Sequence, residues 1–181
     1  IALWGCVVAA FAQTQSEQPI FPLAPTGPIL TVEPDRLFTS SLFGIRVAQE
    51  QDLERDALLN DKSVIEAQLE EEEEQLTEQR DTMPAQEFAV LADAFDEKVQ
   101  QLRRDQLQRS RAFTAKFDRA RQDFFRFSLP VLAEIVRTSG AVAILERRTV
   151  FLAADSIDIT DLAIERINQE LGDGADRVEP Q

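Results

Sequence analysis

The 181-residue chain contains no histidine and no tyrosine, and its only cysteine is Cys6. Histidine is the commonest general base and a frequent metal ligand, while tyrosine supplies a phenolic acid. One cysteine cannot form an internal disulfide, and no glycine-rich phosphate-binding loop is found. These absences argue against an enzyme, and the sequence predicts no catalytic residue, cofactor or metal site.

Basic residues are also scarce. Lysine and arginine total 19 against 33 aspartate and glutamate residues, for a net charge of −14. Phosphates would be repelled by such a surface, which argues against nucleic acid as a partner. The run from Glu70 to Glu74 could suggest a cation site. Five consecutive side chains point around the whole helix, however, so a solvated acidic face is the better interpretation.

Helix breakers are almost absent between Phe43 and Thr138. Gly44 is the only glycine there, and Pro84 and Pro130 are the only prolines. A run of this composition, rich in Glu, Gln, Arg, Leu and Ala, predicts helix. Because Met83 and Pro84 interrupt it, we expect two helices folded back on each other, each roughly 60–80 Å long. Gly44 and Pro130 are candidate bends.

Apolar residues recur at steps of three and four along both halves of this hairpin, which is typical of a coiled-coil seam. Glu72 interrupts the first half, and Gln106 and Arg109 are expected to weaken the second. Two helices cannot cover so many phenylalanines, so some should face another chain or a bound guest. The predicted seam comprises Leu58, Ile65, Leu69, Leu76, Phe88, Leu91, Phe95, Val99, Leu102, Phe113, Phe117, Ala120, Phe124 and Phe127.

Charge divides the hairpin by height. Residues 66–97 carry twelve acids and one base, Arg80, and so about −11. Residues 98–121 carry eight bases and two acids, opposite the acids of residues 46–65. The sequence therefore predicts a shaft joined by opposite charges and a strongly anionic tip.

The first 28 residues are expected to lie outside the fold. Residues 1–12 are apolar and end in Ala10-Phe11-Ala12, the pattern of a secretory signal peptide without its charged beginning. A buried helix and a lipoprotein signal at Cys6 are the alternatives. Residues 13–28 contain four prolines and predict a disordered leader, and residues 172–181 predict a disordered tail.

Short β-segments flank the hairpin. Residues 29–32 predict a strand, and Asp35 is expected to cap the helix that follows. Residues 141–145 and 149–153 predict a β-hairpin, and Asp158 is expected to cap a helix over 159–171. Three short strands and one small helix cannot bury a sizeable core, so we expect oligomerisation to complete the body. The residues expected in this shared body are Ile29, Leu30, Val32, Val142, Ile144, Val150 and Leu152.

The order of these elements, from Ile29 to Asn168, resembles the OmpH/Skp family of periplasmic chaperones. The strand and helix start at 29–38, the exit at 139–145, residues 149–152 and residues 158–161 carry the resemblance. It implies an α+β, mostly α fold: a long antiparallel coiled-coil hairpin projecting from a small β-body completed by trimerisation. The body would comprise residues 29–41 and 129–171, and the arm 42–128 with its tip near 82–85.

The resemblance further implies a jellyfish-shaped homotrimer in the periplasm, which holds unfolded outer-membrane β-barrel proteins between its arms without ATP. The anionic tips depart from the basic tips of well-known members, which argues against binding of lipopolysaccharide or membrane. A structural coiled-coil adaptor in a cell-envelope complex is the alternative function. The residues predicted to contact a client are Met83, Phe88, Val90, Leu107 and Phe113.

Overall fold

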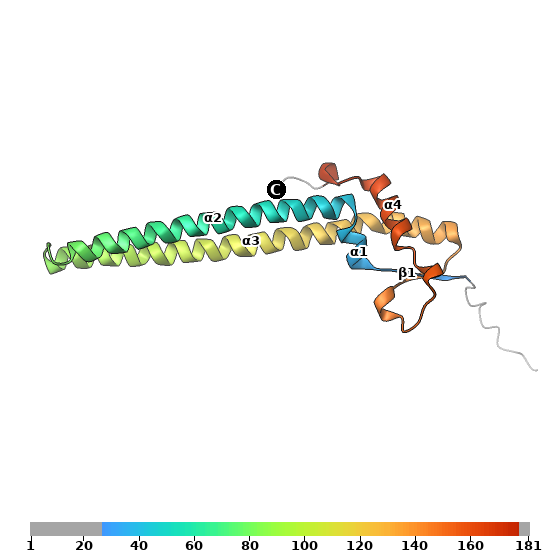
Figure 1. Ribbon diagram of the computed structural model, residues 1–181, viewed down its shortest axis with the longest axis horizontal. Coiled ribbons are helices and arrows are strands. Elements are labelled where there is room, and N and C mark those ends of the chain that lie inside the picture. The colour runs from blue at the N-terminus through green and yellow to red at the C-terminus, as the bar shows by residue number, and fades with distance from the viewer. Residues whose placement is uncertain (1–26, 178–181) are drawn as a thin grey trace, which may run out of the picture.

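The computed structural model describes residues 27–177, and its dominant feature is the predicted hairpin of two long helices (Figure 1). Helix α2 (Leu42–Gln79) and helix α3 (Ala85–Ser139) have 38 and 55 residues and pack against each other. At 1.5 Å per residue they are about 57 and 83 Å long. The turn between them contains Met83 and Pro84, as predicted. The signal peptide and most of the leader, residues 1–26, lie outside the described residues.

The body gathers at the other end of the hairpin. It contains strand β1 (Ile29–Val32), helix α1 (Pro34–Thr39), strand β2 (Ala143–Glu146) and helix α4 (Thr160–Leu171). Three short 3-10 turns complete it: η1 (Arg147–Thr149), η2 (Asp155–Ile157) and η3 (Ala175–Arg177). The fold is thus mostly helical with one small sheet, as the sequence predicted.

The sheet differs from the prediction in its pairing. Strands β1 and β2 run parallel, with Ile29 opposite Ala143 and Val32 opposite Glu146. The predicted β-hairpin is wrong, because residues 149–153 form no strand. The chain turns away at η1, where Arg147 pairs with Asp155 and Asp158 further along. On the opposite edge of β1, the Ile159 amide donates to the Thr31 carbonyl at 2.9 Å.

The hydrophobic core lies at the root of the hairpin, where α1, α2, α3 and α4 meet. Phe43 of α2, Phe124 of α3 and Ile167 of α4 are all fully buried. The Phe124 ring lies 5.2 Å from that of Phe38 and 5.5 Å from that of Phe43, the spacing of favourable aromatic pairs. Most of the side chains that anchor the arm therefore come from segments far apart in sequence.

The observed ends of the helices differ from several predictions. Helix α1 begins at Pro34 with Glu33 as the N-cap residue, so Asp35 does not cap it. Proline suits the first helical position because it has no amide hydrogen to satisfy there. Helix α4 begins at Thr160, with Ile159 and not Asp158 as the N-cap residue. The Asp158 carboxylate nevertheless accepts a hydrogen bond from the Thr160 amide at 2.9 Å. Helix α3 runs through Pro130 without a break.

Two further turns shape the root. The Ser41 hydroxyl accepts a hydrogen bond from the Gly44 amide at 3.0 Å and thereby caps α2, a cap that the sequence analysis missed. Gly140 ends α3 with φ at 66°, a left-handed conformation that glycine adopts readily.

Residues 172–177, assigned from sequence to a disordered tail, pack instead on the root of α2. The Arg46 Nε donates to the Asp173 carbonyl at 2.8 Å, and Gly174 is buried against the Phe43 ring. In Figure 1 this C-terminal segment returns beside the start of α2. Among the helices of residues 27–177, none is both long and apolar enough to cross a membrane.

Candidate functional site

Ion pairs fix the register of the arm. Three pairs join its helices: Glu54 with Lys116, Asp61 with Arg109 at 3.3 Å, and Glu72 with Lys98. The two residue numbers in each pair add to the same total, so the helices run antiparallel without a slip between these pairs. The prediction of a shaft joined by opposite charges is confirmed.

Burial along the arm is shallow. From residue 48 to residue 116 no side chain is fully buried, and the seam residues are only partly covered. Most predicted seam positions, including Leu58, Ile65 and Phe95, are half-buried. Arg109 was wrongly placed on the seam, because it is exposed and pairs with Asp61. Leu91 is also 41% exposed, whereas its neighbour Ala92 is half-buried.

The five predicted client contacts fall into two groups. Met83, Phe88 and Phe113 are half-buried, and the Phe113 ring lies 4.9 Å from that of Phe117, at the edge of the core. Val90 and Leu107 are 65% and 53% exposed. The structure does not bring the five together, because they are spread along the arm.

Helix α2 adds exposed apolar side chains that the sequence analysis missed. Leu53, Leu59 and Val64 are 73%, 58% and 48% exposed. All three lie off the seam, and a search for residues outside the seam pattern of α2 would have found them. The arm therefore carries apolar side chains in water on both helices.

The tip is acidic on its surface. Glu72 is half-buried and pairs with Lys98, whereas the other four residues of the run from Glu70 to Glu74 are exposed. This distribution is what five consecutive residues of a helix must give, since they point in different directions. The run thus forms a solvated acidic surface.

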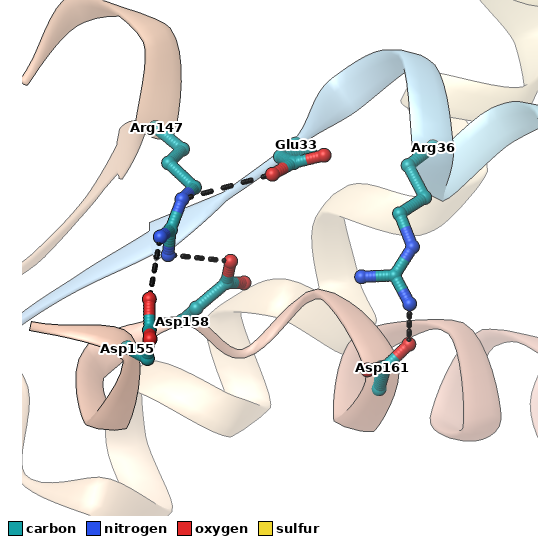
Figure 2. Close-up of a pocket in the computed structure, with 6 residues that line it drawn as sticks. All are labelled: Glu33, Arg36, Arg147, Asp155, Asp158 and Asp161. Atoms are coloured by element: carbon teal, nitrogen blue, oxygen red, sulfur yellow. Dashed lines mark hydrogen bonds and ion pairs between the residues drawn. The ribbon is translucent and has the colours of Figure 1, made fainter.

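An ion-pair cluster around Arg147 ties the body together (Figure 2). The guanidinium lies 2.7 Å from Asp155, 2.9 Å from Asp158 and 3.7 Å from Glu33. Arg36 and Asp161 pair beside it and complete the wall of an open cavity of about 310 Å³. Each carboxylate of the cluster faces an arginine, so the arrangement joins the start of α1 to η1, η2 and α4.

Arginine partners lower the pKa of two aspartates of the body, one of them in this cluster. Burial disfavours the ionised form of Asp158, but hydrogen bonds from Thr160 and the charge of Arg147 outweigh it and lower the pKa of this carboxyl. The pKa of Asp35 is lowered chiefly by a hydrogen bond from Arg121, and also by Arg148. Both aspartates are therefore held ionised and stabilise the folded body at neutral pH.

Asp158→Asn should lower the free energy of unfolding at pH 7 by about 1 kcal/mol, because the ion pair with Arg147 is lost in a partly exposed site. A carboxyl whose pKa is depressed on folding stabilises above its unfolded pKa, about 3.9, and this contribution is lost as the pH falls through its folded value. The melting temperature of the variant should therefore fall less steeply below about pH 4. Thermal melts from neutral pH into the acid range measure this. Asp176→Asn, at an exposed position, is the control. If the melting temperatures of both variants fall with pH at the same slope, the role of Asp158 is contradicted.

The predicted assembly residues are partly buried within the single chain. Leu30 and Val32 belong to the core, and Ile144 and Val150 are half-buried. Ile29 and Val142 are 46% and 40% exposed. The loop after η1 is the most exposed apolar segment of the body: Phe151 is fully exposed and Leu152 is 86% exposed.

A family comparison matches this architecture. Residues 28–167 fit the model described as outer membrane protein (OmpH-like). The chain belongs to the OmpH family. The match begins just before β1 and ends in α4, so it covers most of the body and the whole arm, including the acidic tip.

Solved structures include a similar fold. An OmpH-like protein of Caulobacter crescentus superposes with a TM-score of 0.75 at 17% sequence identity, covering 80% of this chain and 86% of the other. At that identity the likeness concerns the fold. Curated protein sequences gave no match.

Proposed function

We propose that the chain is an ATP-independent holdase of the periplasm, which binds unfolded outer-membrane proteins between the arms of a homotrimer. Its membership of the OmpH family supports this proposal. The similar Caulobacter structure is described as a candidate outer membrane chaperone. The adaptor remains the alternative that a client assay separates from the holdase.

The arm is the observation on which the proposal rests. It projects tens of ångströms from the body, buries no side chain between residues 48 and 116, and exposes apolar groups on both helices. An unfolded client would make many weak contacts with such a surface. Their sum keeps the client from aggregating without any chemical step, by mass action.

Val90→Ser combined with Leu107→Ser should weaken suppression of client aggregation several-fold, because both exposed apolar contacts are lost. Light scattering of two unrelated unfolded β-barrel proteins, diluted from denaturant, measures the effect. Leu129→Ser removes a side chain that is 63% exposed on the same helix but in the body, and it should leave suppression unchanged.

Two results would count against this proposal. If the wild-type chain suppresses neither client but binds one folded envelope protein, the adaptor is favoured. If the arm variant and the Leu129→Ser variant behave alike, the client does not contact the arm at these residues.

The open side of the body favours assembly. Strand β2 pairs with β1 along one edge, and Val142, Leu145, Phe151 and Leu152 are exposed nearby in the sequence. Residues 149–152 have strong β-propensity and no partner strand within the described chain, so strands of neighbouring subunits could pair with them. Three copies would close one body and align three arms around a cavity.

Phe151→Ser combined with Leu152→Ser should raise the dissociation constant of the assembly by at least roughly tenfold, because two large apolar side chains lose their burial. Analytical ultracentrifugation over a range of concentrations measures this. Leu53→Ser, at a 73% exposed position on the arm, is the matched control. A wild-type chain that stays monomeric at every concentration would remove both the shared body and the cavity.

The charge of the tips limits their partners. Residues 66–97 carry about −11 per chain, and the exposed glutamates lie at the surface. Anionic lipid and lipopolysaccharide would be repelled by such tips. The holdase is therefore expected to hold its clients through apolar contacts without anchoring to the membrane by its tips.

A further inference from the structure

A groove in the body is not used by the proposed holdase. It lies between the last part of α3 and α4 and has a volume of about 550 Å³. Val131 and the buried Ile135 line it from α3, and Leu162, 44% exposed, lines it from α4. Charged and polar residues complete the lining, among them Arg166, Gln169, Glu134 and Glu170. A lining that combines apolar side chains with hydrogen-bonding groups suits an extended peptide.

The N-terminal side of the described chain begins close to one end of this groove. The Val142 amide donates to the Pro28 carbonyl at 3.0 Å. Gly27 lies so close to the Gly140 carbonyl that an added Cβ would overlap it. Gly140 follows Ser139, which lines the groove. The residues that precede Gly27 are therefore tethered beside the end of the groove.

We propose that the groove binds the segment Pro19–Pro25 of the same chain. Its sequence, Pro-Ile-Phe-Pro-Leu-Ala-Pro, has three large apolar side chains and no charge. Three prolines favour the extended polyproline II conformation, so little conformational entropy is lost on binding. The backbone of that conformation leaves its carbonyls free to accept hydrogen bonds, and the Arg166 guanidinium in the lining is a donor. The Gln169 amide donates to Glu165 at 3.2 Å and has a second N–H to offer.

The lengths agree. The groove follows α3 from Pro130 to Ser139, roughly 14 Å at 1.5 Å per residue. The five residues from Ile20 to Ala24 span roughly 15 Å in polyproline II geometry. The Pro28 carbonyl already continues the pairing of β1 with β2, so the chain must reverse before it. Proline and glycine, found here at Pro25 and Gly27, are common in turns. So short a tether gives an effective concentration on the order of millimolar, which favours this segment over a free peptide.

Disulfide trapping in the full chain tests the proposal directly. Both test variants carry Cys6→Ser. Phe21→Cys combined with Leu162→Cys, in the groove, should form an intrachain disulfide at least roughly tenfold faster than the control pair. The control combines Phe21→Cys with Leu107→Cys, which lies on the arm. Denaturing gels distinguish the intrachain product from a covalent dimer. Equal rates for the two pairs overturn the proposal, and so does a product of dimer mass, which would place the segment in the groove of another copy. Intact mass must show that residues 19–26 are retained in the purified protein, and their loss also overturns it.

Hydrogen exchange tests the proposed binding independently and needs no cysteine substitutions. Phe21→Ser with Leu23→Ser should increase exchange in peptides covering α4 by several-fold, whereas the polar control Gln15→Ser with Gln18→Ser should not. No change in either variant overturns the proposal. Because neither measurement depends on clients, its failure can be told apart from failure of the holdase function.

Discussion

Replacing Gly44 with alanine should destabilise the chain by about 3 kcal/mol, although alanine is the better helix former. A Cβ built at Gly44 would overlap the carbonyl oxygen of Phe38 and lie 2.7 Å from its carbonyl carbon. Both atoms belong to backbone and cannot swing aside, so α1 would have to move away from α2. Urea unfolding followed by circular dichroism measures the loss.

The control for this substitution is Gly140→Ala. Nothing lies within 4 Å of a Cβ at Gly140, so only its φ of 66° opposes a side chain, at a cost of about 1 kcal/mol. Gly44→Ala should therefore be the more harmful of the two changes. A gain in stability at position 44, the result that helix propensity alone predicts, would show that Phe38 does not approach Gly44 as described.

The arm was predictable because its information is local. A stretch with almost no helix breakers, an apolar repeat and a Met83-Pro84 interruption define two helices and their turn without reference to other parts of the chain. The shaft ion pairs, such as Asp61 with Arg109, follow from the same antiparallel register. Errors arose where the repeat was ambiguous, as at Leu91 and Arg109.

The body was harder because its contacts join distant parts of the sequence. Residues 149–152 have high β-propensity, and a nearby strand made a hairpin the simplest prediction. The actual partner of β2 is β1, more than 100 residues earlier. The loop that follows β2 leaves the sheet, and Arg147 at its start pairs with Asp155 and Asp158 further along. Local patterns do not specify such pairings.

The predicted client contacts show the same limit of local sequence patterns. Periodicity cannot decide how exposed an apolar residue at the edge of a seam is, so Val90 and Phe113 were grouped although one is exposed and the other packs on Phe117. Likewise, the capping role of Ser41 depends on the end of α1, which the sequence left undefined.

Phe124→Ala should have the largest effect on the single chain, a loss of about 3–5 kcal/mol. Phe124 is fully buried, and its ring packs on Phe38 of α1, Phe43 of α2 and Phe125 of α3, with centroids 5.2–5.5 Å apart. Since domains are typically stable by only 5–15 kcal/mol, the cavity should loosen the joint between arm and body. Chemical unfolding at low protein concentration measures the loss.

The matched control is Phe151→Ala, the same truncation at a fully exposed phenylalanine. At concentrations where the chain is a single copy, it should change the unfolding free energy by less than about 0.5 kcal/mol. The proposed assembly would bury this side chain, so an effect is expected only at concentrations at which subunits associate. If Phe124→Ala and Phe151→Ala were equally mild in the dilute chain, the aromatic cluster would not be what holds the arm to the body.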